Sequence, residues 1–146
     1  MLCLRTCNSL VWFSSLESKA IIHEFKEECA VWSCVWNTDD HRYFYCGLSN
    51  GKIGIYDIRK TGGRIGTLEF SNKPVIHLAH MNQRPGHPFS VAGLLATSLS
   101  QCAFFHQLDK TMVNHQKYMV LESVNIYSAA FDRSTRLVAV SCRPDK

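Results

Sequence analysis

The chain has 146 residues, of which 46% are hydrophobic and 11% aromatic, a composition typical of one globular domain and unlike that of a disordered chain. Its formal net charge of +4 comes from 16 lysines and arginines against 12 aspartates and glutamates, which are scattered along the sequence. This predicts a mildly basic surface without indicating a nucleic-acid-binding protein. No apolar run approaches the roughly 18 residues of a membrane span, so we expect no membrane segment.

Short apolar and aromatic segments separated by turn residues follow one another from residue 30 to residue 60, the pattern of consecutive antiparallel strands, and the turn at Gly62-Gly63 leads into a fourth segment. Asn50-Gly51 predicts a type I′ hairpin turn, because that turn needs a positive φ at both central residues. The four strands expected here occupy residues 32–36, 43–48, 53–58 and 64–70.

This pattern recurs with the period of about 40 to 50 residues that is typical of four-stranded β-propeller blades. Residues 32–36 align with 76–80 and with 127–131, and each segment would begin a blade. Residues 53–59 align with 103–109, and both segments lead into a Lys-Thr pair. We therefore predict an all-β fold, a partial β-propeller of about three blades.

The predicted blades divide the chain into four parts. Pro85, Gly86 and Pro88 place a surface loop at 81–92, since proline cannot continue a central strand. An open arc of blades would leave apolar faces uncovered at 10–13 and 137–140, so we expect an aggregated or oligomeric chain. The parts are the end of one blade at 1–28, full blades at 29–72 and 73–122, and the start of another at 123–146.

The seven cysteines are odd in number and irregularly spaced, and several lie in apolar, strand-like segments. This favours reduced, buried thiols, which are typical of cytosolic and nuclear proteins. The cysteines are Cys3, Cys7, Cys29, Cys34, Cys46, Cys102 and Cys142.

Residues 45–60 resemble the second half of a WD repeat, with Tyr56-Asp57 in place of the usual Trp-Asp pair. Three further segments point to a narrower family within the WD-repeat proteins, and the similarity that they and their spacing define extends over most of the chain. They are similar to the seven-bladed-type propeller of the RING finger and WD repeat family of ubiquitin ligases, which acts on replication protein A at stalled forks. The segments are Asp-Ile-Arg-Lys-Thr at 57–61, Gly-Leu-Leu-Ala-Thr-Ser-Leu at 93–99 and Arg-Pro-Asp-Lys at 143–146.

In that family a RING finger and a coiled coil precede the propeller, which recruits replication protein A for ubiquitination. The resemblance implies a nuclear, and also cytoplasmic, role in the DNA damage response and interstrand cross-link repair. Its partners would be replication protein A and the remaining blades. A RING finger needs closely spaced Cys-x-x-Cys pairs, and this sequence has none. We expect no cofactor, metal or catalytic centre in this chain, with zinc and ubiquitin transfer confined to a RING finger elsewhere in the parent protein.

The positions of several individual residues in the expected strands and turns indicate that they serve the structure rather than a chemical reaction. His77 and His80, three residues apart on one expected strand, would point to opposite faces and do not predict a shared metal. Asp57 is expected to cap backbone amides in the turn that follows it. We expect structural roles for Trp32, Trp36, Gly51, Tyr56 and Asp57.

Loops between second and third strands, and loops that enter each first strand, share one face of a propeller, its usual contact surface. We predict that residues of these loops contact a partner, with solvation of plain loops as the structural alternative. The candidates are Glu28, Ser49, Asn50, Lys73, Ser98, Leu99 and Asn125.

Two other functions remain open. One is a scaffold unrelated to ubiquitin, which the absence of RING ligands in the parent protein would favour. The other is a nucleic-acid-binding propeller, suggested by the net charge and by Arg59, Lys60 and Arg64. A steep loss of DNA affinity with salt would favour it. An independent enzyme ranks last, since no arrangement of a nucleophile with a base can be defended.

Overall fold

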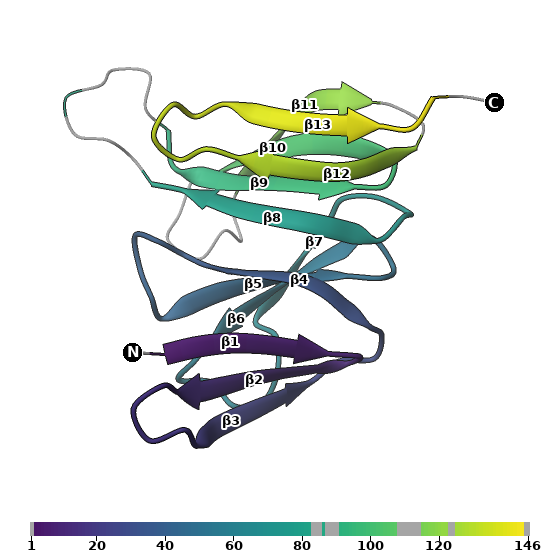
Figure 1. The fold of residues 1–146 in the computed structure, drawn as a ribbon. Coiled ribbons are helices and arrows are strands. Elements are labelled where there is room, and N and C mark those ends of the chain that lie inside the picture. The colour runs from purple at the N-terminus through teal and green to yellow at the C-terminus, as the bar shows by residue number, and fades with distance from the viewer. Residues whose placement is uncertain (1, 83–85, 87–90, 108–114, 123–124, 145–146) are drawn as a thin grey trace.

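The computed structural model describes residues 2–82, 86, 91–107, 115–122 and 125–144. Every regular element within these residues is a β-strand, and they include no helix long and apolar enough to cross a membrane. Figure 1 shows four sheets that follow one another along the chain, which confirms the all-β prediction. In chain order the strands are β1 (Leu2–Cys7), β2 (Leu10–Ser15), β3 (Ile21–Lys26), β4 (Val31–Trp36), β5 (Tyr43–Leu48), β6 (Lys52–Asp57), β7 (Gly66–Glu69), β8 (Val75–Met81), β9 (Gly93–Ser98), β10 (Gln101–Gln107), β11 (His115–Glu122), β12 (Ile126–Phe131) and β13 (Val138–Cys142).

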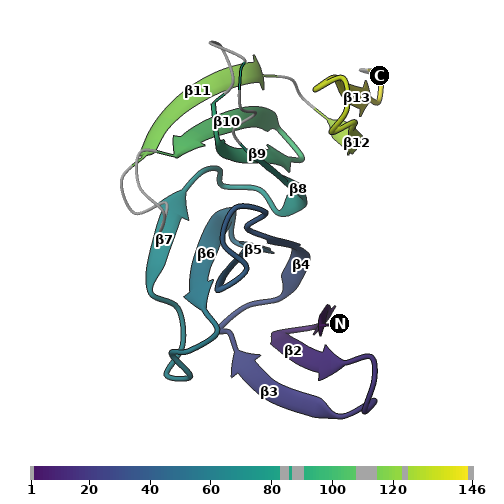
Figure 2. The same cartoon turned by 90° about the vertical axis from the view of Figure 1, so that its left-hand side faces the viewer.

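Each sheet is an antiparallel meander in which consecutive strands are neighbours. We name them sheet A (β1–β3), sheet B (β4–β7), sheet C (β8–β11) and sheet D (β12–β13). Figure 2 shows an open arc, with β4 and β8 on one side and β7 and β11 on the other. Strand β8 contacts both β4 and β12, so the first strands of sheets B, C and D lie next to one another. This is the arrangement of blades in a β-propeller.

The strands expected between residues 30 and 70 agree with β4 to β7 to within about two residues at each end. The Lys-Thr pair at 110–111, most of the loop 81–92 and residues 145–146 of the third family segment lie outside the described residues.

The hairpin between β5 and β6 does not use the predicted type I′ turn. Of Asn50 and Gly51, only Gly51 has a positive φ, of 83°. Gly51 N donates a hydrogen bond to Leu48 O at 3.1 Å, and Asn50 Oδ1 accepts one from Lys52 N at 3.2 Å. The result is a three-residue loop that ends in a left-handed glycine. A Cβ on Gly51 would lie 2.0 Å from Ser71 O, so glycine also lets the β7–β8 loop pass close by.

Three groups of buried side chains join neighbouring sheets. Aromatic rings dominate between sheets A and B, where the Phe44 ring centroid lies 5.0 Å from that of Phe13 and 4.6 Å from that of Tyr56. Aliphatic side chains such as Ile55 dominate between sheets B and C. The group between sheets C and D is smaller. Its buried members are Ala79, Leu95 and Cys102.

Tyr56 also binds Glu27, the residue that follows β3. Its hydroxyl donates a hydrogen bond to the buried Glu27 carboxylate, whose other oxygen lies 3.7 Å from Arg64 Nη1. Burial raises the pKa of the Tyr56 hydroxyl, so this group stays protonated and keeps donating. The bond therefore fastens the end of sheet A to sheet B.

The expectation that the segment 10–13 is uncovered was wrong. Val11 and Phe13 are buried, because alternate residues of β2 point toward sheet B. Among the side chains of sheet A whose burial is described, the exposed large apolar ones are Ile21 and Ile22 on β3. At the other end of the arc, Leu137 is 69% exposed, in line with the expectation for 137–140.

Candidate functional site

The loops predicted to contact a partner lie at one end of the strands, on the right-hand side of Figure 1. Backbone hydrogen bonds of 2.8 to 3.0 Å join neighbouring loops. We call this surface the loop face, which consists of residues 27–30, 49–51, 70–74, 99–100 and 125–126. The bonds run from Ser49 N to Ala30 O, from Ser71 N to Gly51 O and from Ile126 N to Leu99 O.

A hollow of about 600 Å³ opens on the loop face between sheets B, C and D, and we call it the loop-face hollow. Three of the predicted partner residues, Lys73, Leu99 and Asn125, line it together. The other lining residues, which were not among the predicted partner residues, are Trp32, Ile76, Ser100, Ile126, Tyr127 and Arg143.

A β-bulge brings one side chain from each first strand to the hollow. The pairing of β4 shifts between Val31 and Ser33, and β8 and β12 shift at the equivalent places. The residues at the three shifts are Trp32, Ile76 and Tyr127. A bulge re-aims a side chain out of the regular alternation of a strand. The repeat alignment, in which these three residues are the first of each matched segment, is the signal that could have identified them.

The charge at the hollow is positive. Its described lining residues include Lys73 and Arg143 but no aspartate or glutamate. The Arg143 guanidinium carbon lies 4.7 Å from the Tyr127 ring centroid, and Arg143 N donates a hydrogen bond to Asn125 O at 2.9 Å. Within the part of the chain that the structure describes, neither Lys73 nor Arg143 belongs to an ion pair. Both cations are therefore available to an anionic group.

The remaining predicted partner residues differ in accessibility. Glu28, Ser49 and Asn50 lie on the loop face outside the hollow. Ser98 is buried, and its Oγ accepts a hydrogen bond from Gln101 N at 3.1 Å. The prediction for Ser98 was wrong, because this hydroxyl holds the β9–β10 turn and cannot reach a partner.

Of the residues predicted to have structural roles, Trp36 and Asp57 make contacts within the fold, whereas Trp32 does not lie in the core. The Trp36 ring centroid lies 5.3 Å from that of Phe13, at the joint of sheets A and B. Asp57 Oδ1 accepts hydrogen bonds of 2.9 Å from both Arg59 N and Arg59 Nε, and this bonding lowers the pKa of Asp57. Trp32 departs from the prediction: the bulge turns it outward, and it is 54% exposed. Trp32 therefore belongs to the surface of the hollow.

His80 is buried and joins sheets B and C. Its Nδ1 accepts a hydrogen bond from Thr38 N at 3.1 Å, and its Nε2 lies 3.2 Å from Gln107 Oε1. Burial lowers the pKa of His80 and also that of the half-buried His77. Among the described residues, no group of three or more His, Cys, Asp or Glu side chains is placed to hold a metal ion.

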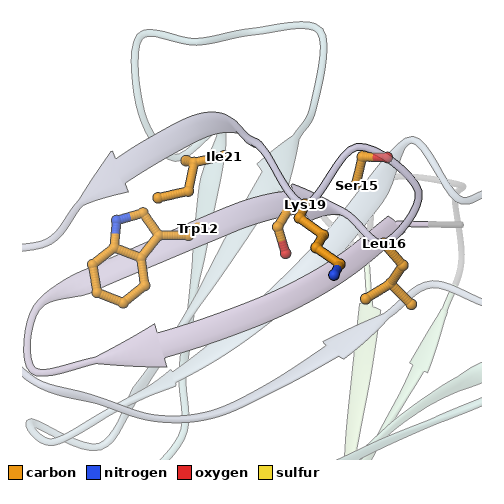
Figure 3. Close-up of a pocket in the computed structure, with 6 residues that line it drawn as sticks. Trp12, Ser15, Leu16, Lys19 and Ile21 are labelled. Carbon is orange, nitrogen blue, oxygen red and sulfur yellow. The ribbon is translucent and has the colours of Figure 1, made fainter.

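A second hollow, of about 590 Å³, lies on sheet A, away from the predicted partner residues. Figure 3 shows Trp12 and Ile21 along one part of it, with Leu16 and Lys19 near the turn between β2 and β3. Trp12 Nε1 donates a hydrogen bond of 2.5 Å to Glu24, so the polar edge of this indole is already engaged. The loop-face hollow remains the candidate site.

The model of the family described as "E3 ubiquitin-protein ligase RFWD3 WD40 domain" matches residues 6–146. The chain is 30% identical over 142 residues to E3 ubiquitin-protein ligase RFWD3 of Homo sapiens and 31% identical over 136 residues to that of Mus musculus. These matches cover 95% and 91% of this chain but only 18% and 17% of the relatives. The chain thus spans less than a fifth of their length.

Two solved structures share the fold. A chain in the crystal structure of the mitotic checkpoint complex has a TM-score of 0.65 and 18% identity, over 95% of this chain and 41% of that chain. The β-propeller domain of Myceliophteria thermophila Cps50 (Swd1) has a TM-score of 0.57 and 15% identity, over 82% of this chain and 33% of that chain. These likenesses confirm the partial β-propeller predicted from the sequence.

Proposed function

Because the chain belongs to the family of the E3 ubiquitin-protein ligase RFWD3 WD40 domain, we propose that it is a protein-interaction module that holds a substrate protein for a RING-type ubiquitin ligase. The observation that carries this proposal is the loop-face hollow, which is bordered by exposed aromatic rings and two cations. Tryptophan, tyrosine and arginine in a concave site are the residues that most often dominate binding energy in protein interfaces.

The proposed partner is replication protein A or a protein like it, and the proposed setting is the nuclear response to DNA damage at stalled replication forks. Support comes from the resemblance of residues 57–61, 93–99 and 143–146 to this family of ligases and from the family match over residues 6–146. The relatives are named as ubiquitin ligases, so ubiquitin transfer and the zinc of a RING finger belong, in this proposal, to the whole ligase.

Direct nucleic-acid binding through Arg59, Lys60 and Arg64 is a weaker alternative. Arg59 Nη2 lies 2.5 Å from Asp57, and Arg64 Nη1 lies 3.7 Å from Glu27. Two of the three cations are therefore already balanced by carboxylates of the chain itself, which lowers their attraction for phosphates. A scaffold without a ubiquitin connection would use the same surface and differs only in its partner.

The test is binding of purified replication protein A to the immobilised chain, measured by biolayer interferometry. We expect saturable binding, and Trp32→Ala should weaken it about tenfold or more, as truncation of a dominant interface residue does. Trp12→Ala, which removes the same side chain from the second hollow, is the matched control and should bind like the parent chain. If the unsubstituted chain does not bind replication protein A, this partner is ruled out. If Trp32→Ala and Trp12→Ala weaken binding equally, the loop-face hollow is ruled out as the binding surface.

A further inference from the structure

We propose that the loop-face hollow binds an extended acidic peptide, which inserts one apolar side chain between Trp32, Ile76 and Tyr127 and places carboxylates against Lys73 and Arg143. This rests on the proposed function and goes further by giving the chemistry of the bound segment. Neither the family match nor the similar proteins assign a ligand to these residues.

The walls of the hollow fit an apolar side chain. Trp32 and Tyr127 are 54% and 62% exposed although they lie on the first strands of sheets B and D. Between them lie Ile76 and Leu99, which are half-buried. Three bulged strands thus present large apolar surfaces to one shared space, and covering such surfaces is a strong driving force for binding.

The size of the hollow selects a segment over a folded domain. Its volume of about 600 Å³ is within the usual range for sites that take small ligands, roughly 300 to 1,000 Å³. A short extended segment fits such a space, whereas the broadly convex surface of a folded domain does not fill it. The partner must therefore offer an extended stretch of chain.

The cations select negative charge. Lys73 lies on the loop that enters sheet C, and Arg143 directly follows β13. The two lie in the lining of one hollow, so an apolar residue held there has a cation near it on the side of sheet C and another on the side of sheet D. The Tyr127 ring beneath the Arg143 guanidinium orients this group, and an arginine fork then binds a carboxylate through two parallel hydrogen bonds.

A nucleic acid fits this site less well than a peptide. Single-stranded nucleic acids are held by a track of cations along the backbone together with aromatic rings for successive bases. The described lining of the hollow has two cations, one on each side, rather than a track of them. Apart from Trp32 and Tyr127, its apolar lining consists of the aliphatic residues Ile76, Leu99 and Ile126. The observations therefore favour a peptide.

The experiment measures fluorescence polarisation of two labelled peptides with the full chain. Both peptides have a central leucine; one flanks it with aspartate and glutamate, the other with lysine and arginine. We expect the acidic peptide to bind at least about tenfold more tightly, and Lys73→Glu with Arg143→Glu to reverse the preference. Lys19→Glu with Lys60→Glu makes the same change in net charge at the opposite end of the strands and should retain the preference for the acidic peptide.

Each outcome decides the proposal. The proposal is supported if the peptide preference reverses in the Lys73→Glu/Arg143→Glu variant but not in the Lys19→Glu/Lys60→Glu control, and if binding weakens when serine replaces the central leucine. It is overturned if the chain binds both peptides equally, if the Lys73→Glu/Arg143→Glu variant keeps the preference for the acidic peptide, or if a single-stranded oligonucleotide binds more tightly than the acidic peptide. If the chain binds replication protein A but not the acidic peptide, the proposed function stands and only the ligand class falls.

Discussion

Strands β9 and β13 are both second strands of their sheets and both are rich in apolar residues, yet their burial differs. Every residue of β9 is buried, whereas β13 alternates between half-buried and exposed positions. Sheet C has sheets B and D against its two faces, while sheet D has a described neighbour on one face only. A neighbouring sheet on each face, rather than the composition of a strand, therefore decides how much of that strand is buried.

The joints between sheets differ as well. Sheets A and B meet through interlocked aromatic rings and the Tyr56–Glu27 bond, so sheet A is well fastened although it lies at one end of the arc. Sheets C and D meet through only three buried hydrophobic side chains among the described residues, those of Ala79, Leu95 and Cys102. We therefore expect the joint of sheets A and B to contribute more stability than the joint of sheets C and D.

The largest effect should come from Phe44→Ala. This ring is fully buried among Phe13, Phe25 and Tyr56, and its removal should lower the free energy of unfolding by about 3 to 5 kcal/mol. Ile22→Ala, on an exposed position of sheet A, should change it by no more than about 0.5 kcal/mol. Urea unfolding measures both. Similar losses in the two variants would show that the aromatic joint is not the main attachment of sheet A.

A smaller loss should follow Tyr56→Phe. This variant keeps the ring but removes the donor to the buried Glu27 carboxylate, at a cost of about 1 to 3 kcal/mol. Glu69→Gln is the control, because it breaks the exposed pair with Lys52 and should cost only about 0 to 1 kcal/mol. If the two variants unfold at the same urea concentration, the Tyr56–Glu27 bond does not fasten the joint.

The smallest effect concerns pH and the joint of sheets B and C. Burial lowers the pKa of His80 below its ordinary value of 6.5, so the unfolded chain binds a proton that the folded chain does not. Stability from this group is fully present above about pH 6.5 and is lost as the pH falls below that value toward the lower pKa of the folded state. Melting temperatures between about pH 7.5 and 5.5 test this.

In the same series, His80→Gln should flatten the decline, while His41→Gln, at an exposed position, should keep it. A decline of the same size in the His80 variant would assign the pH dependence to other groups.

The strands of sheet B could be predicted from the sequence because antiparallel hairpins are local, and both the alternating pattern and the turn residues are visible in a short window. The alignment of residues 32–36, 76–80 and 127–131 identified the first strands of sheets B, C and D for a similar reason, because each strand is marked by its own short apolar segment. The turn at Asn50-Gly51 was predicted wrongly, since the same dipeptide suits two kinds of hairpin loop and the close approach of Ser71, which belongs to another loop, is not local.

The candidate site could be predicted only in part. Loop membership identified Lys73, Leu99 and Asn125, but it could not show that Ser98 turns inward to hold its own turn. A large aromatic residue in a strand is more often buried than exposed, so the sequence pattern does not distinguish Trp32 from a core residue. Only the bulge, which depends on how two strands pair, turns it outward.

Hydrogen exchange of the chain, alone and with purified replication protein A, tests most directly whether the loop face is where a partner binds. We expect the partner to slow exchange at residues 27–30, 49–51, 70–74 and 99–100, because backbone amides in a covered surface exchange less readily. Slowed exchange confined to the loops at the opposite end of the strands, residues 16–20, 37–42 and 58–65, would contradict the account.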